Sequence, residues 1–349
     1  MKHIKFTAFI LTAALFLPVT LSCGKKNEPR SATFYEYFDT VSTVYSYADE
    51  SEALFSRRRE QIEAELEEYH RLFDIYHEYS GMYNLRTVNL NAGISAVKVD
   101  ERLIDLLLYA KELHALTDGE INVAMGSVLS LWHECRQNAE DDPKGARLPD
   151  PERLREAGEH TDIDSIVIDR EASTVYISDR ELSIDVGALG KGYAAEKIAK
   201  GLRENGVSSY VLDIGGNLRL IGQKPDGSGW ITGITHPDRS SAQAFAARVN
   251  ISDTSCVTSG SYERYFTVEG KDYHHIIDKD TLYPSEYFVS VTVITPDSAL
   301  ADALSTALFC MSYEDGTALI EKIGGVEVLW ITAEGERLST EGFDRMLFT

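Results

Sequence analysis

The chain of 349 residues contains few cysteines, which stand at Cys23, Cys135, Cys256 and Cys310. No two of them are close in sequence, and an odd number remains beyond Cys23, so the spacing indicates neither a disulfide framework nor a cysteine metal site. Positive charge is also scarce. The chain has 34 Lys and Arg against 56 Asp and Glu, a formal net charge of -22. A surface this acidic repels phosphate backbones and argues against nucleic acid as a partner, although a bound divalent cation would still permit a nucleotide ligand.

Long apolar runs are absent except at the N-terminus. Lys2 and Lys5 precede an apolar stretch at 6–21, which is short for a membrane span and has the basic front end of a secretory signal. The stretch ends at Leu21-Ser22-Cys23, which resembles a bacterial lipoprotein cleavage site, with Thr20 where the common pattern has leucine. Diacylation of Cys23 would anchor the protein to a membrane face.

This N-terminus predicts an exported protein. We expect a signal peptide at 1–22, a lipidated Cys23 with a polar tether at 23–33, and one folded domain at 34–349. The predicted location is extracytoplasmic, on the periplasmic side and anchored to a cell membrane. A plain cleaved signal or an uncleaved anchor is the alternative.

Apolar periodicity predicts mixed secondary structure. Three- and four-residue steps predict helices at 60–76, 102–116, 123–135, 192–205 and 299–311. Strands are expected at 34–47, 165–168, 174–177, 182–184, 210–214, 218–221, 287–295 and 326–331. The polar stretch 138–151 is expected to be an exposed loop. Because strands and helices do not alternate regularly, the pattern favours an α+β fold over a parallel doubly wound sheet.

A glycine-rich turn at 185–192 is the first segment whose residues are suited to ligand binding. It reads Asp-Val-Gly-Ala-Leu-Gly-Lys-Gly and opens the helix predicted at 192–205. Glycines let the main chain approach a ligand, and helix N-termini present free N–H groups to anions. Lys191 adds a charge suited to phosphate, and Asp185 could accept hydrogen bonds from a ribose or a ring. The P-loop spacing is absent, and a structural strand-to-helix turn is the alternative.

Two further segments carry polar groups at suggestive spacing. Asp302 and Thr306 are four apart and share a helix face; their hard oxygens suit Mg²⁺, which completes its shell with water and substrate phosphates. An isolated pair of this kind is more often structural.

The block 258–266 precedes His274 and His275, of which at most one faces a site if the segment is extended. A histidine there could act as a base or contact phosphate, or it could simply lie at the surface.

Together these segments resemble the FAD:protein FMN transferase family, the ApbE-type lipoproteins, from about residue 34 to near the C-terminus. Residues 185–193 fit Asp-x-Gly-Gly/Ala-x-Ala/Gly-Lys-Gly-Tyr, 258–265 fit Thr-Ser-Gly-x-Tyr-x-Arg-Tyr, and 301–306 fit Ala-Asp-Ala-x-Ser/Asp-Thr. The resemblance implies mainly antiparallel sheets packed with helices and an FAD site between subdomains. One loop departs from the family pattern, because 277–284 reads Ile-Asp-Lys-Asp-Thr-Leu-Tyr-Pro where the family has Ile-Asp-Pro-x-Thr-Gly-Tyr-Pro.

The resemblance also implies roles for individual residues. Mg²⁺ would be held by Asp302, Thr306 and the main-chain carbonyl of Ala188. Catalysis would involve Asp302 and Lys191, with His275 as the first candidate for the base. FAD would be contacted by a larger set drawn from several segments: Phe38, Tyr76, Glu120, Ile121, Asn122, Asp185, Lys191, His275, Ile276 and Ile277.

The reaction implied is transfer of FMN from FAD to a threonine hydroxyl of an acceptor protein, with release of AMP. Acceptors would be exported or membrane redox proteins, such as electron-transport subunits or FMN-binding domains, with an exposed threonine. Three alternatives remain open: a pyrophosphatase that cuts FAD with water, a flavin-binding lipoprotein without catalysis, and an assembly or adhesion lipoprotein that binds neither flavin nor metal.

Overall fold

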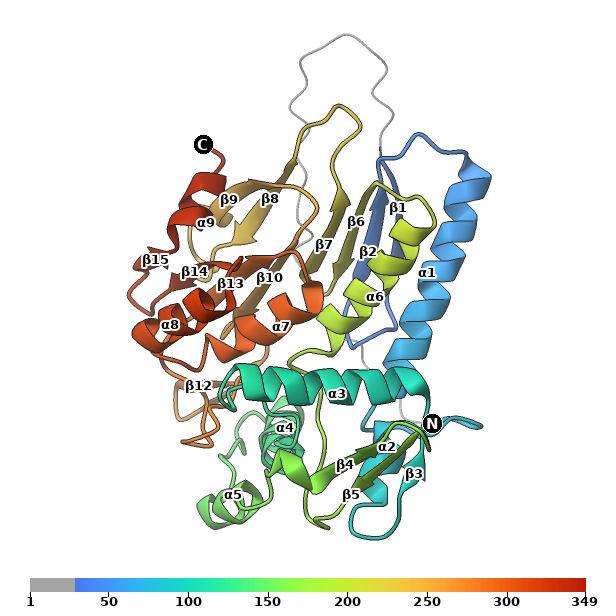
Figure 1. The fold of residues 1–349 in the computed structure, drawn as a ribbon. Coiled ribbons are helices and arrows are strands. Elements are labelled where there is room, and N and C mark those ends of the chain that lie inside the picture. Colours follow the sequence, from blue (N-terminus) through green and yellow to red (C-terminus); the bar gives the residue numbers. More distant parts are fainter. Residues whose placement is uncertain (1–28) are drawn as a thin grey trace.

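The computed structural model describes residues 29–349 (Figure 1). The predicted signal peptide and Cys23 therefore lie outside the described residues. Within the part that is described, no helix combines the length and the apolar character that a bilayer span requires.

An eight-stranded antiparallel sheet forms the centre of the molecule (Figure 1). Its strands follow the order β1-β2-β6-β7-β10-β13-β14-β15. Their bounds are β1 Arg30–Phe34, β2 Ser42–Ser46, β6 Ser209–Ile214, β7 Asn217–Gly222, β10 Ser255–Gly260, β13 Ser290–Thr295, β14 Glu327–Ile331 and β15 Arg337–Ser339. Three of the neighbouring pairs, β1–β2, β6–β7 and β14–β15, are joined by short antiparallel connections, whereas the others are joined through intervening helices or strands.

Both faces of this sheet are covered. Along β14, Val328 and Trp330 pack with helices α7 (Ser298–Ala307) and α8 (Tyr313–Ile323), while Leu329 and Ile331 pack with β8, β9 and α9 on the other side. The remaining covering elements are α1 Glu52–Phe73, α6 Gly190–Glu204, β8 Trp230–Thr235, β9 Phe245–Ile251 and α9 Glu341–Met346. Burial on both faces explains the apolar run in β14, where four of the five residues are hydrophobic and buried.

A second layer of shorter elements lies below the sheet in Figure 1. It contains α2 Leu85–Leu90, α3 Glu101–Leu116, α4 Gly126–Asp141, α5 Pro151–Gly158, the 3-10 turn Ile163–Ser165, and the small sheet of β3 (Val97–Lys98), β5 (Thr174–Ile177) and β4 (Ile166–Asp169). A hairpin of β11 (Tyr265–Val268) and β12 (Lys271–His274) packs beside α4. The α+β prediction is confirmed, and helix 102–116 and strand 174–177 lie within a residue of their predicted bounds.

The strand predicted at 34–47 is wrong, because the chain reverses within it. Tyr37 accepts a hydrogen bond from the N–H of Thr40 at 3.2 Å, and the two residues between them have φ values of 56° (Phe38) and 51° (Asp39). Two successive positive φ values form a tight hairpin-type turn. β1 and β2 then pair with Phe34 opposite Ser42 and Arg30 opposite Ser46. Residues 30–33, predicted as tether, therefore belong to β1.

Several predicted helix and strand bounds also differ. α1 begins eight residues earlier than predicted, and Asp74 ends it by accepting hydrogen bonds from the main chain beyond, so Tyr76 lies outside the helix. α4 is shifted towards the C-terminus and takes in part of the predicted loop 138–151, whereas α7 ends at Ala307. Residues 182–184 form only one bridge, between Ser183 and Met125, because no second strand lies alongside.

Candidate functional site

The glycine turn leads directly into α6. The N–H groups of Leu189 and Gly190 both donate to the carbonyl of Val186, at 3.1 and 2.8 Å, and Gly187 donates to Oδ1 of Asp185 at 2.7 Å. These bonds close the turn and start the helix at Gly190. Leu189 occupies the N-cap position and offers no capping side chain, so the first turn of α6 needs acceptors from elsewhere.

Asp302 of α7 supplies one of these acceptors. Its Oδ2 accepts a hydrogen bond from the N–H of Gly192 at 2.8 Å, and the aspartate is only 4% exposed. A Cβ on Gly192 would lie 2.2 Å from the carbonyl oxygen of Ser298 and 2.5 Å from Cβ of Asp302. Glycine is therefore required for α6 to approach α7 this closely, and this approach joins two of the three sequence blocks.

The third sequence block, 258–265, lies at the same α6–α7 contact because part of it forms β10. Ser259 Oγ lies 2.7 Å from Ser305 Oγ and 3.4 Å from Thr306 Oγ1. Ser305 donates its hydroxyl hydrogen to the carbonyl of Asp302 at 2.9 Å, so Ser259 must be the donor in its bond to Ser305. The structure thus gathers the predicted metal ligands on α7 beside β10 and the glycine turn.

The oxygen atoms at this junction fit a hard divalent cation. Asp302 Oδ1 and the carbonyl of Ala188 receive no hydrogen bond from any described residue, and Thr306 adds a hydroxyl. Within residues 29–349, no group of three His, Cys, Asp or Glu side chains forms a metal cluster. One carboxylate with a hydroxyl and a carbonyl is a ligand set that suits Mg²⁺, which keeps several waters or substrate oxygens.

His275 is placed by the strand that precedes it. Its N–H donates to the carbonyl of Arg264 at 3.1 Å, and ring Nδ1 lies 3.2 Å from the same oxygen. Because a carbonyl only accepts, Nδ1 carries the hydrogen and Nε2 keeps a free lone pair. Desolvation by the surrounding protein, followed by repulsion from Arg264, His274 and Lys191, lowers the pKa of His275 to about 3. The residue is nevertheless exposed to solvent, which reduces the effect of desolvation on its ring.

Two arginines that the sequence did not single out belong to the same charged cluster, since Arg264 lies near both His275 and Arg136. Burial, and then repulsion by Arg264, lowers the pKa of Arg136. Its Nε is buried and has no hydrogen-bond partner among the described residues, while one terminal nitrogen lies 3.0 Å from His133 Nδ1. Lys191 forms no ion pair with any described residue. Cations gathered in this way favour an anionic ligand, although Glu140 Oε1 lies 3.9 Å from Arg136 Nε. Arg264 belongs to the recognised block and could have been selected, whereas Arg136 lies on α4 with no local signal.

Tyr76 and Asp185 face the same cluster. The Tyr76 ring is stacked on His133, with ring centroids 5.0 Å apart, and remains 49% exposed. Burial of its hydroxyl and the nearby charge of Asp185 raise the pKa of Tyr76 to about 12. Burial likewise raises the pKa of Asp185, against the opposing effects of the Gly187 N–H, His133 and Arg264. An exposed flat ring beside these charges is a suitable platform for an aromatic ligand.

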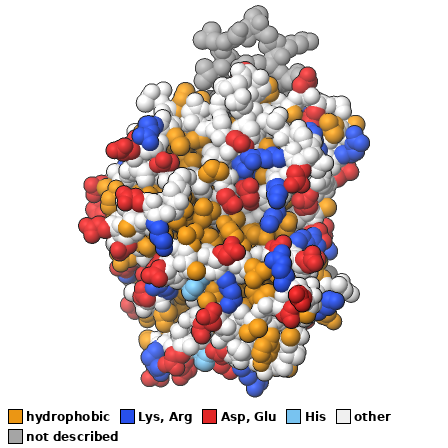
Figure 2. Space-filling model, in the orientation of Figure 1, with side chains coloured by type: hydrophobic (Ala, Val, Ile, Leu, Met, Phe, Trp, Pro, Cys, Tyr) orange, Lys and Arg blue, Asp and Glu red, His pale blue; other side chains and the backbone are white. Residues whose placement is uncertain are grey.

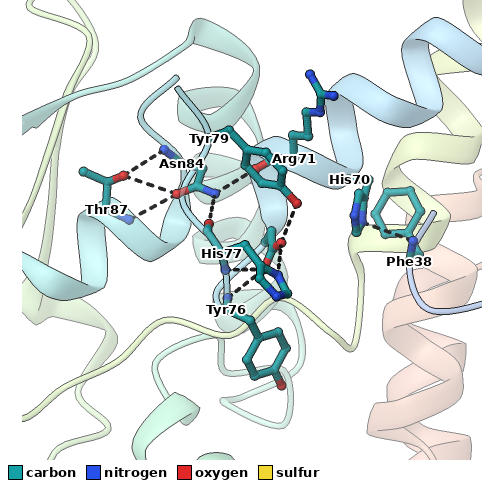
Figure 3. A network of polar contacts seen from close by, with 9 residues as sticks. Phe38, His70, Arg71, Tyr76, His77, Tyr79, Asn84 and Thr87 are labelled. Atoms are coloured by element: carbon teal, nitrogen blue, oxygen red, sulfur yellow. Dashed lines mark hydrogen bonds and ion pairs between the residues drawn. The ribbon is translucent and has the colours of Figure 1, made fainter. Parts of the chain in front are cut away.

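A single carboxylate holds the loop that carries Tyr76. Asp74 Oδ1 accepts from the N–H groups of Tyr76 at 2.6 Å and His77 at 3.1 Å, and Oδ2 accepts from the Tyr79 hydroxyl at 2.7 Å (Figure 3). Burial alone would raise the pKa of Asp74, but the hydrogen bonds from Tyr79, Tyr76 and His77 outweigh it and keep the pKa below its usual value. Asn84 ties the same loop to the end of α1 through the carbonyls of Arg71 and His77.

Phe38 sits in the turn between β1 and β2. Its ring packs edge-on to His70 and near Phe73, and its N–H donates to His70 Nδ1 at 3.2 Å (Figure 3). The turn adjoins the cluster, since Arg264 donates to the carbonyl of Asp39 at 3.5 Å. Phe38 is thus beside the site but half-buried against α1.

The remaining predicted FAD contacts are either bonded to other protein groups or buried. Glu120 pairs with Lys279 at 3.3 Å, and Asn122 uses its side chain for the carbonyl of Thr161 and the N–H of Ala124. Burial raises the pKa of Glu120 and Lys279 opposes that rise. The side chains of Ile121, Ile276 and Ile277 are buried in three hydrophobic clusters, so any contact they make with a ligand would be through the main chain.

Comparison with known proteins decides the family. The model of the ApbE family matches residues 38–330, which is most of the chain. The chain belongs to the ApbE family. The match takes in the glycine turn, the β10 block and the α7 block that meet at Asp302.

Curated members of the ApbE family are similar along most of their length. The FAD:protein FMN transferase of Treponema pallidum is 34% identical over 261 residues, covering 71% of this chain and 70% of that protein. The protein of the same name from Escherichia coli K12 is 28% identical over 348 residues, covering 97% and 95%. An ApbE crystal structure from Thermotoga maritima matches with a TM-score of 0.79 at 27% identity, covering 92% of this chain and 100% of that one. The flavinyl transferase ApbE of Pseudomonas stutzeri matches with a TM-score of 0.74 at 27% identity, covering 91% and 96%.

Proposed function

We propose that this chain is an FAD:protein FMN transferase that uses Mg²⁺ and modifies a threonine of an exported or membrane redox protein. The single observation that carries this proposal is the hydrogen bond from Gly192 to Asp302 Oδ2, which brings the anion-binding turn and the hard oxygen ligands together. The names of the curated relatives support the same activity.

The reaction forms one bond to phosphorus and breaks another. The threonine oxygen forms a bond to the FMN-side phosphorus of FAD, and the bond from that phosphorus to the bridging oxygen breaks. AMP leaves with the bridging oxygen, FMN remains on threonine as a phosphoester, and the hydroxyl proton must be taken up by a base. Mg²⁺ on Asp302, Thr306 and the Ala188 carbonyl would neutralise charge on the pyrophosphate.

The chain's own cations supply the rest of the charge stabilisation. Lys191 and Arg264 lie near Asp185 and His275, and Arg136 lies near Arg264; their positive charge suits the negative oxygens that develop on the phosphorus. Tyr76 offers its exposed ring to the flavin.

His275 is our candidate base. Its free Nε2 can accept a proton, but a pKa of about 3 makes it a weak base. Arg264 and Lys191 contribute to that low pKa, so a bound pyrophosphate that offsets their charge would raise it.

The proposal is tested by FMN transfer from FAD to a threonine-bearing FMN-binding domain in the presence of Mg²⁺, detected by mass spectrometry. Asp302→Ala should fold and lose transfer. Ala188→Gly is the matched control, since Ala188 acts through its carbonyl, and it should retain transfer. Full activity of Asp302→Ala would contradict the proposal. Fast AMP release by the wild-type protein without acceptor would instead indicate an FAD pyrophosphatase, and retained FAD without turnover would indicate a flavin-binding protein.

We also propose that Cys23 is lipidated and holds the protein on the extracytoplasmic side of a membrane. The support is the basic and apolar N-terminus that ends at Leu21-Ser22-Cys23. Mass spectrometry of the membrane-extracted protein should show a diacylated N-terminal cysteine. Recovery of Cys23→Ala in the membrane fraction in the same amount as the wild-type protein would contradict this proposal.

A further inference from the structure

The outer edge of β11, in the hairpin of β11 and β12, pairs with no other strand among the described residues. The strands are joined by Glu269 and Gly270, whose φ values of 51° and 85° form a two-residue turn. Thr267 stands opposite Asp272 in the register, and Tyr265 stands opposite His274. Within residues 29–349, β12 is the one strand that pairs with β11.

The pattern of main-chain hydrogen bonds in the hairpin shows which main-chain groups face outward. His275 donates its N–H to the carbonyl of Arg264, so Arg264 and His275 form a hydrogen-bonded pair. Such pairs alternate along antiparallel strands. The N–H and C=O groups of Tyr265 and Thr267 therefore point away from β12. Among the described residues, none forms a main-chain hydrogen bond with them from outside the hairpin.

A groove runs along this free edge. Its volume is about 340 Å³, within the size range of ligand sites. One wall comes from the end of α4 and the residues after it, and the other from β11 and its turn; the lining residues are Ala139, Glu140, Pro143, Tyr265, Phe266, Thr267, Glu269 and Gly270. Phe266 packs on Trp132 of α4, which fixes the separation of the two walls.

One end of the groove meets the cationic cluster. Arg264 immediately precedes Tyr265 on β11, and its carbonyl accepts from His275. On the opposite wall, Arg136 lies one helical turn before Glu140, and Nε of Arg136 is 3.9 Å from Glu140 Oε1. A chain lying in the groove would thus lead towards the residues that we propose bind the FAD pyrophosphate.

We propose that this groove binds an extended segment of the acceptor polypeptide as a third strand on β11, which brings the acceptor threonine to the pyrophosphate. This inference rests on the proposed function. Addition of a strand to a free edge uses the main-chain groups of Tyr265 and Thr267, and so requires little of the partner's side chains. The modest volume selects small side chains, and the acidic side chains of Glu140 and Glu269 disfavour acidic residues in the bound segment.

Thr267→Pro tests the strand addition. Proline removes the outward N–H without removing a main-chain hydrogen bond of the hairpin, as edge strands tolerate. It also removes the bond that the Thr267 hydroxyl donates to Asp272 Oδ1 at 2.6 Å, and Thr267→Val removes that bond equally. Thr267→Val is the matched control, because it alters the side chain and keeps the N–H. The probes are a ten-residue peptide with one threonine among glycine and alanine residues, and a folded FMN-binding domain. We expect the acceptor KM of Thr267→Pro to rise about tenfold, the effect of about one lost hydrogen bond, with an unchanged KM for FAD.

A second pair of variants covers the case in which proline disturbs the hairpin. Glu140→Trp should fill the groove from an exposed position of α4, and Glu140→Ala removes the same ion pair without filling it. Only the tryptophan variant should raise the acceptor KM by tenfold or more. Wild-type transfer with an unchanged acceptor KM in both Thr267→Pro and Glu140→Trp would overturn the groove proposal alone. Failure of the wild-type protein to modify either probe would overturn the proposed function, and this inference with it.

Discussion

The main-chain N–H of Gly192 donates a hydrogen bond to Oδ2 of Asp302 at 2.8 Å across 110 positions of sequence. This contact gives the first turn of α6 an acceptor that Leu189 cannot provide, and it fixes the orientation of the carboxylate. The other oxygen of Asp302 is left for a ligand, so one aspartate serves both packing and the candidate metal site.

Gly192→Ala should destabilise the fold. The new Cβ would overlap the Ser298 carbonyl and Cβ of Asp302, neither of which can move without separating α6 from α7, and we expect a loss of about 2 kcal/mol or more. Gly201, in the same helix, is the control because a Cβ there meets nothing within 4 Å. Gly201→Ala should stabilise by about 1 kcal/mol through helix propensity. Urea unfolding measures both, and equal effects of the two substitutions would contradict the packing argument.

Asp302→Asn should separate the two roles of the aspartate. The amide oxygen can still accept from Gly192, so the free energy of unfolding should stay within about 0.5 kcal/mol of wild type, whereas Asp302→Ala should lose about 1 kcal/mol, as for a lost cap. Both variants should lose Mg²⁺-dependent FMN transfer, because both remove the negative charge. Urea unfolding and the transfer assay in parallel check this, and an Asn variant with normal Mg²⁺-dependent turnover would show that the charge is not needed.

Asp74→Asn should weaken FAD binding through the loop of Tyr76. The neutral amide offers one acceptor oxygen where the carboxylate offers two to Tyr76, His77 and Tyr79, so the Tyr76 ring should be less well held. We expect the KM for FAD to rise three- to tenfold with the Mg²⁺ concentration dependence unchanged. Tyr83→Phe, at a 62% exposed tyrosine, is the control and should leave the KM for FAD unchanged. A changed Mg²⁺ dependence in Asp74→Asn would place Asp74 in the metal site instead.

Arg58→Ala should be strongly destabilising. Glu50 has a side chain that is only 2% exposed, and it is held by Arg58 at 2.5 Å, Tyr210 at 2.5 Å, and Ser46. Removing the cation leaves a buried carboxylate, which costs about 3 kcal/mol or more. Arg155→Ala breaks an exposed pair with Glu159 and should cost less than about 0.5 kcal/mol. Thermal and urea unfolding of the two variants check the difference, and similar losses would contradict it.

The low pKa of His275 makes stability depend on pH. In the unfolded chain the ring titrates near its ordinary value of about 6.5, while in the folded protein the pKa is about 3. Between these values the unfolded state binds more protons, so this group's contribution to stability is lost as the pH falls through the window. Because the residue is exposed, we expect only a fraction of the full effect.

His275→Gln should therefore flatten the fall in stability between pH 7 and pH 4. The pKa of Asp213 is raised by burial to about 6, which has the opposite sign, but Asp213 is present in both proteins and cancels in the comparison. Urea midpoints across this pH range provide the measurement. Parallel curves for the wild-type protein and the variant would show that the folded pKa of His275 is close to its ordinary value.

The sequence predicts the parts of this site that lie within short contiguous blocks. Asp185, Lys191, Asp302 and Thr306 each stand in a recognisable pattern, and the structure places all three blocks around the Gly192–Asp302 contact. Helices such as α3, in which apolar residues recur at three- and four-residue steps over many residues, are also predictable, because burial of one helix face requires that spacing.

Features that arise only from tertiary contact were missed. Arg136 and His133 stand on α4, and only the fold places them beside Tyr76 and Arg264. The reversal at Phe38 and Asp39 was missed because Phe38 is an unusual residue at positive φ, although Asp39 is a common one, and the turn is supported by packing of Phe38 on His70 and Phe73. Leu282 likewise has a φ of 61° at the position of the family's glycine.

The direction of β1 has a consequence for how an anchored protein would meet its acceptor. Arg30 and Ser46 stand at one end of the β1–β2 pair, whereas the Phe38 turn and its contact with Arg264 stand at the other. From Cys23 to Arg30 the chain can span at most about 25 Å. If Cys23 is lipidated, the bilayer would lie nearer the Arg30 end and the catalytic groups would face outward, about 17 Å further along the strands. Acceptors whose threonine stands well above the lipid surface should then be modified in preference to those whose threonine lies at the headgroups.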